Sequence, residues 1–134
     1  MTPEQLIKKE ILLIASKDGL WDTFSDGPEC EITDKNVDTL YGDFEGLSED
    51  YEEEYRGGDY NTDLQRDDPV FSYFEQKEVA RKMSDGRWVG WTYWYGGGNH
   101  AYPEEVEWME YAYFLECTER EVLTIVRDFK KIPA

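Results

Sequence analysis

The segment of residues 90 to 108, "GWTYWYGGGNHAYPEEVEW", holds the side chains with the most evident chemical uses. It contains His100, the single histidine of this 134-residue chain, beside three consecutive glycines and several aromatic residues. An imidazole can act as a general base or a metal ligand, and tryptophan rings can form a platform for a ligand. We therefore consider Trp91, Trp94 and His100 as one candidate ligand site.

The surroundings of this segment do not favour catalysis. No serine or cysteine nucleophile motif accompanies His100, and the glycine run lacks the spacing and the lysine of a phosphate-binding loop. A glycosidase needs a pair of carboxylates, but acidic residues on a short helical turn more often form a solvated face. The acidic residues in question are Glu104, Glu105, Glu107 and Glu110. We predict a protein that is not an enzyme, has no catalytic residues and uses no cofactor.

Two further patterns partly resemble metal or thiol sites. Asp59, Asn61 and Asp63 match the first ligand positions of a calcium loop, but the turn glycine and the bidentate glutamate that should follow are missing. Cys30 and Cys117 make no CxxC pair or zinc-like spacing. We expect no metal site, and we expect Cys117 to be a buried, inert thiol within an apolar strand.

The charge is concentrated in one part of the chain. The net charge is −17, and residues 22 to 68 carry seventeen acidic residues against three basic ones. A surface of this sign repels nucleic acids and anionic membranes and attracts basic proteins. The sequence therefore excludes direct binding to DNA, RNA or lipid and favours a protein partner with a basic surface.

Aromatic residues are interleaved with the acids in "YGDFEGLSEDYEEEYRGGDY", residues 41 to 60. Carboxylates can pair with the partner's Arg or Lys, and tyrosines can anchor the contact. Duplex DNA carries one charge per roughly 1.7 Å, so the excess acids match about 24 Å of duplex. The predicted partner-binding residues are Asp43, Glu45, Glu49, Asp50, Tyr51, Glu52, Glu53, Glu54, Tyr55, Asp59 and Tyr60.

In size and composition the chain is similar to small phage or plasmid inhibitors of restriction, CRISPR and DNA-processing enzymes, and to immunity proteins that block nuclease toxins. The similarity does not extend to a motif, so no residue is carried over. It implies a DNA-mimic-like inhibitor of a basic nucleic-acid-binding protein or nuclease. Two alternatives are an enzyme or carbohydrate-binding module that uses the aromatic strand, and an assembly protein that forms a homodimer through its sheet.

These residues must be positioned by a helix and a sheet. Thr2, Pro3 and Gln5 form a helix start signal and Gly19 a helix end, so we predict an amphipathic helix within residues 1 to 19. The acidic segment of residues 22 to 68 is predicted to be irregular, with a short helix from Ser48 to Gly57. No apolar stretch approaches the roughly 20 residues that span a membrane, so we expect a cytoplasmic protein.

Residues 69 to 131 are predicted to form an antiparallel sheet. "VFSYFEQKEVARKM" and "RWVGWTYWY" flank "SDG", which is typical of a tight hairpin. "EYAYFLEC" and "EVLTIVRDF" flank "TER" and suggest a second hairpin, and "YPEEVEWM" between the two hairpins suggests one helical turn that begins at Pro103. The predicted fold is a single α+β domain of residues 1 to 134, in which the N-terminal helix packs on about four strands.

Overall fold

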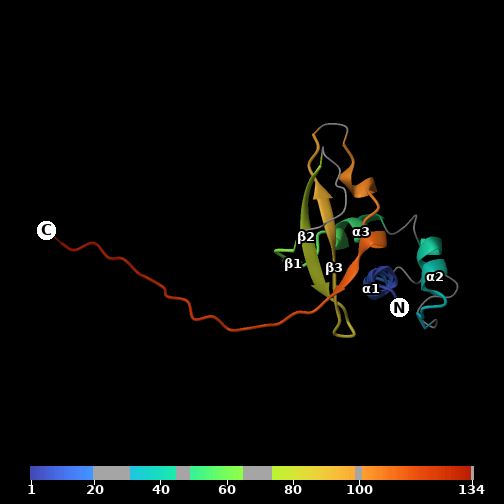
Figure 1. The fold of residues 1–134 in the computed structure, drawn as a ribbon, viewed down its shortest axis with the longest axis horizontal. Helices are drawn as coiled ribbons and strands as arrows, with labels where there is room; N and C mark the ends of the chain where they lie inside the picture. Colours follow the sequence, from blue (N-terminus) through green and yellow to red (C-terminus); the bar gives the residue numbers. More distant parts are fainter. Residues whose placement is uncertain (20–30, 45–48, 65–73, 99–100, 134) are drawn as a thin grey trace.

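A computed structural model of the chain describes residues 1–19, 31–44, 49–64, 74–98 and 101–133 (Figure 1). The helices are α1 (Pro3–Lys17), α2 (Val37–Phe44) and α3 (Glu49–Arg56). The strands are β1 (Tyr60–Asn61), β2 (Glu75–Lys82), β3 (Trp88–Tyr95) and β4 (Tyr113–Leu115). Two short 3-10 helices, η3 (Pro103–Glu105) and η4 (Met109–Tyr111), lie between β3 and β4. The predicted α+β class, with an N-terminal helix and a four-stranded antiparallel sheet, is confirmed.

Helix α1 begins and ends where the sequence indicates. The Thr2 hydroxyl accepts a hydrogen bond from the Gln5 backbone N–H, and the Gln5 side chain accepts one from the Thr2 backbone N–H. This capping box satisfies two donors that the first helical turn leaves unpaired. Past the C-terminus of the helix, Gly19 has a φ of 84°, which glycine adopts without steric cost.

The sheet has the strand order β1-β2-β3-β4, and every neighbouring pair is antiparallel. Strands β2 and β3 form the predicted hairpin, in which Glu75 pairs with Tyr95 at one end and Lys82 with Trp88 at the other. Gly86 has a φ of 93° in the turn between the two strands. The turn chemistry of "SDG" therefore sets the register of the two longest strands.

The core lies between the sheet and the helices. Helix α1 packs against α2, α3, η4 and β4, so that it lies between α2 and the rest of the domain (Figure 1). Trp91 of β3 is fully buried and lies against Tyr55 of α3 and Trp108, with ring centroids 5.7 Å and 5.2 Å away. Further core residues are Leu6, Ile7, Ile11, Leu12, Val37, Phe44, Val79, Met83, Val89, Trp94 and Met109. Within the part of the chain that the structure describes, no helix has the length and apolar character that a membrane crossing requires.

Strand β3 is buried on both faces. Val89 and Trp91 point to one face, and Thr92 and Trp94 on the other face are also buried. The Trp94 indole N–H donates to the Gln76 side chain on β2, 3.2 Å away. The large aromatic residues on both faces therefore reflect a central strand and not a surface that awaits a ligand.

The C-terminal part of the sheet differs from the prediction. Strand β4 ends at Leu115, and residues 116–133 leave the body as an extended segment that pairs with none of the described strands (Figure 1). The predicted strand "EVLTIVRDF" is thus absent from the sheet, and β1 supplies the fourth strand. The second hairpin does not form because "TER" contains no glycine, asparagine or proline that would favour a tight turn. Cys117 is consequently exposed, and the prediction of a buried thiol was wrong.

Gly90 provides a test of the contact between β3 and β4. A Cβ atom at this position would lie 2.8 Å from Cε2 of Tyr113 and 2.8 Å from Cδ1 of Leu115. We expect Gly90→Ala to lower the free energy of unfolding by about 1–3 kcal/mol, because the overlap forces both side chains to move. Urea titration followed by tryptophan fluorescence measures the change.

The matched control is Gly42→Ala within α2, where an added Cβ meets nothing within 4 Å. This change should raise the free energy of unfolding by about 0.5–1 kcal/mol, because alanine favours the helix. A Gly90→Ala variant as stable as the parent chain would contradict the close contact of Tyr113 and Leu115 with Gly90.

Candidate functional site

An acidic groove lies between α3 and the short helix η3. Its volume is about 570 Å³. Carboxylates from two separate parts of the sequence line it, together with a single arginine. The lining residues are Glu49, Asp50, Glu52, Glu53, Arg56, Glu104 and Glu105. We refer to these seven residues as the acidic groove.

The spacing of residues on α3 directs its acids outward. Tyr51 and Tyr55 lie one helical turn apart; Tyr55 is buried and Tyr51 is half-buried against the body. Glu49 and Glu53, also one turn apart, are exposed. Two like charges at this spacing destabilise a helix slightly, while acids in the first turn interact favourably with the helix dipole. Packing of the tyrosine face against the body therefore holds the helix in position, and the opposite face presents the carboxylates to solvent.

Arg56, the cation of the groove, has contacts within the chain for each nitrogen of its guanidinium. Arg56 is 4% exposed, and its Nε and a terminal nitrogen donate to both carboxylate oxygens of Glu53 at 3.1 Å and 2.8 Å. The other terminal nitrogen donates to the Trp94 carbonyl oxygen at 2.7 Å, and the guanidinium lies 4.6 Å from the ring centroid of Tyr93. Arg56 thus neutralises Glu53 and, among the described residues, pairs with none of the other acids of the groove.

The remaining carboxylates have few partners. Glu52 accepts a hydrogen bond from the Tyr41 hydroxyl at 2.7 Å. Among the residues that the structure describes, no lysine or arginine forms an ion pair with Glu49, Asp50, Glu104 or Glu105. Four carboxylates around one groove therefore repel each other and favour the approach of a cation.

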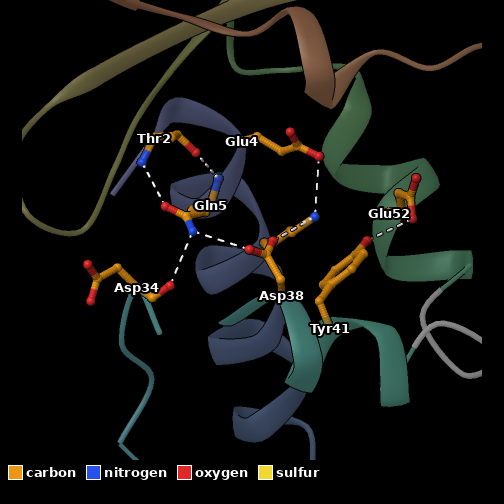
Figure 2. Close-up of polar contacts among 8 residues, drawn as sticks. Thr2, Glu4, Gln5, Asp34, Asp38, Tyr41 and Glu52 are labelled. Carbon is orange, nitrogen blue, oxygen red and sulfur yellow. Dashed lines mark hydrogen bonds and ion pairs between the residues drawn. The ribbon is translucent and has the colours of Figure 1, made fainter. Parts of the chain in front are cut away.

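A polar network fixes α2 and α3 against α1 (Figure 2). The Gln5 side-chain amide donates to the Asp34 main-chain oxygen and to the Asp38 carboxylate, each at 3.2 Å. Lys8 of α1 forms ion pairs with Asp38 at 3.0 Å and with Glu4 at 3.2 Å. The Tyr41–Glu52 hydrogen bond then connects α2 to α3, so the network reaches the edge of the groove.

The network shifts the pKa values of its charged groups. Hydrogen bonds from Lys8 and Gln5 hold the pKa of the Asp38 carboxyl below its usual range. Partial burial acts to lower the pKa of Lys8, but its hydrogen bonds to Asp38 and Glu4 outweigh burial and raise this pKa. Both shifts favour the charged pair that joins α1 to α2.

The structure separates the predicted partner-binding residues into groups. Glu49, Asp50, Glu52 and Glu53 meet at the groove, and Glu54 is exposed on the same helix. Asp43 is exposed on α2, whereas Glu45 lies outside the described residues.

The predicted tyrosine anchors do not all face solvent. Tyr55 is 2% exposed, and burial raises the pKa of its hydroxyl, so this residue stabilises the core and is closed to a partner. The Tyr51 hydroxyl donates to Asp18 at 3.0 Å, which ties α3 to the end of α1. Tyr60 is exposed and lies beside Trp88, and Asp59 forms an ion pair with Arg81 at 3.3 Å.

The alternative ligand site is not formed by its tryptophans. Trp91 and Trp94 point to opposite faces of β3 and are both buried, so they make no common platform. His100 lies outside the described residues. Two residues of the calcium-loop pattern have structural roles: Asn61 pairs with Val79 in the sheet, and Asp59 forms an ion pair with Arg81. Within the described ranges, no cluster of three potential metal ligands is present.

Sequence reasoning missed the contribution of η3 to the groove. Glu104 and Glu105 were interpreted as a solvated face, and both are exposed, but they lie across the groove from α3. Their position depends on the path from β3 through three glycines with positive φ values to Pro103. No local pattern connects residues 49–53 with residues 104–105, so the pairing follows only from the tertiary structure.

Comparisons with protein-family models, with curated proteins and with solved structures found no match to this chain.

The Asp38 carboxylate provides a test of the network through pH. Because its pKa is lowered in the folded state, Asp38 stabilises the fold above its ordinary pKa, and this stabilisation disappears as the pH falls below about 4. At pH 7 we expect Asp38→Asn to lower the free energy of unfolding by at most about 1 kcal/mol, as for other exposed ion pairs. The difference from the parent chain should shrink at pH 3, which urea titrations at the two pH values would measure.

Asp34→Asn is the matched control, because Asp34 enters the network through its main-chain oxygen. It should leave stability nearly unchanged at both pH values. An equal effect of the two substitutions would show that net charge, and not the Lys8–Asp38 contact, accounts for the result.

Proposed function

We propose that the chain is a non-enzymatic acidic binding protein whose groove receives basic side chains of a protein partner. The observation that carries the proposal is a set of carboxylates at one site that pair with no cation in the described part of the chain, namely Glu49, Asp50, Glu104 and Glu105. A protein that needed these acids for its own stability would pair them, as it pairs Glu53 with Arg56. Unpaired carboxylates around a groove instead match a partner that supplies the cations.

The partner that fits best is a nucleic-acid-binding protein or a nuclease. Such proteins carry clustered Arg and Lys that contact phosphates, and a groove with carboxylates on both sides offers them an alternative anion. Outside the groove, Glu54 of α3 and Asp43 of α2 are further exposed acids, and Tyr60 is an exposed aromatic side chain. In this role the chain competes with DNA or RNA for its target and acts as an inhibitor or immunity protein in the cytoplasm.

The proposal is tested by neutralising the groove. A variant with Glu49→Gln, Asp50→Asn, Glu104→Gln and Glu105→Gln leaves the Arg56–Glu53 and Tyr41–Glu52 contacts intact. Affinity capture from the native host should yield a basic protein with the parent chain. This protein should bind the variant at least about fourfold more weakly, since four interfacial ion pairs of about 0.2–1 kcal/mol each are lost.

The matched control neutralises four other exposed acids, with Asp34→Asn, Asp63→Asn, Glu107→Gln and Glu110→Gln. Both variants have the same net charge, so a specific groove predicts weakening in the first variant only. Binding by the parent chain should also decrease steeply with salt and be displaced by duplex DNA. Capture of a partner whose binding is independent of salt, or equal weakening by both variants, would rule out the groove as the recognition site.

A further inference from the structure

The C-terminal segment of residues 116–133, which we call the tail, contains an apolar stretch, is extended and pairs with none of the described strands. Its large apolar side chains are between 71% and 101% exposed. They are Val122, Leu123, Ile125, Val126, Phe129 and Ile132. Single chains seldom leave so many neighbouring apolar residues in solvent, and such surfaces mark interaction sites.

The tail has the composition of a β-strand. Residues 122–126 read "VLTIV", in which four of the five residues are β-branched and none is charged. A strand that is apolar on both faces is typical of the interior of a sheet. The tail continues directly from β4, whose last residue, Leu115, pairs with Trp88 at the first position of β3.

The tail cannot reach a strand partner in its own sheet by simple continuation. Beyond Leu115 the chain has already passed the beginning of β3, so the segment extends away from the body (Figure 1). Residues 116–132 contain no glycine, asparagine or proline, so no turn signal returns the segment. Since the segment pairs with none of the described strands, a strand of a second molecule is the partner that fits it.

The charges of the tail are complementary to those of a second tail in the antiparallel direction. Residues 116–121 carry three acids and one base, and residues 127–131 carry three bases and one acid. Antiparallel pairing places the acidic half of each tail beside the basic half of the other. A two-fold symmetric contact requires this kind of self-complementary surface.

One register satisfies both the charges and the apolar residues. With the two-fold axis at Thr124, Glu121 lies opposite Arg127 and Arg120 lies opposite Asp128. In the same register Val122 lies opposite Val126 and Leu123 opposite Ile125. Opposite charges and apolar pairs that face each other directly both stabilise an antiparallel sheet. A shift of the register by one residue, which places Arg120 opposite Arg127, brings like charges together.

We propose that the chain forms a homodimer in which the two tails pair as antiparallel strands about Thr124. The two tails together carry twelve apolar side chains, and their contacts across the paired strands stabilise the dimer along with the backbone hydrogen bonds. Pairing joins the two β4 strands into one continuous sheet and covers an edge that would otherwise recruit other chains. The inference does not depend on the function of the acidic groove.

The first experiment is the solution mass of the full chain by sedimentation equilibrium. We expect a dimer of the 15.8 kDa chain. Leu123→Ser with Ile125→Ser should convert it to a monomer with an unchanged near-ultraviolet circular dichroism spectrum, because the body does not contact these residues. Cys117→Ser with Thr118→Ser, in the same tail, removes no apolar side chain and should leave the dimer intact.

The second experiment tests the register by reversing charges. Glu121→Arg alone places two arginines opposite each other, and Arg127→Glu alone places two glutamates opposite each other. Each should raise the dimer dissociation constant about tenfold or more, because each change acts twice by symmetry. The double variant Glu121→Arg with Arg127→Glu restores opposite charges and should return the constant close to that of the parent chain.

A monomeric parent chain at all concentrations would overturn the proposal. A dimer that survives Leu123→Ser with Ile125→Ser would show that the tails do not form the interface. Failure of the double charge reversal to restore the dimer would overturn the pairing about Thr124.

Discussion

The buried guanidinium of Arg56 is the contact on which the relative positions of α3, the sheet and the acidic groove depend. The guanidinium donates a hydrogen bond to the Trp94 carbonyl oxygen on β3. The main-chain carbonyl oxygen of Arg56 accepts a hydrogen bond from the Trp91 indole N–H at 2.7 Å. Helix and strand are thus joined by two reciprocal bonds, and Tyr55 stacks on Trp91 beside them. Removing one partner of a buried charge costs several kcal/mol, so this position tolerates little change. Since Arg56 also holds Glu53, the residue that fixes the fold also sets the inner wall of the groove.

Local sequence signals predicted those parts of the fold that local chemistry determines. The capping box at Thr2 and Gln5 located α1, and the "SDG" turn located the β2–β3 hairpin. The helix start and stop signals at Ser48 and Gly57 located α3. In each case the residues that carry the signal lie within a few positions of the structure they form.

The remaining features depend on contacts between distant residues. The acidic composition identified α3 as one side of a charged surface, but the opposite wall at Glu104 and Glu105 depends on the whole path from β3 to η3. Tyr55 was predicted as an anchor for a partner because its neighbours are acidic, yet Trp91 from β3 places it in the core. The tail was predicted as a strand of the sheet, and its composition supports a strand. Composition does not specify which chain provides the partner.

The unpaired acids of the groove also bear on how this protein can change over evolutionary time. Glu49, Asp50, Glu104 and Glu105 are exposed, and within the described chain they form no ion pair, so their replacement removes little that holds the domain together. The residues that hold the domain together, such as Arg56 and Trp91, form a separate set. Mutations can therefore accumulate at the groove, and alter what it recognises, without eroding the stability of the fold.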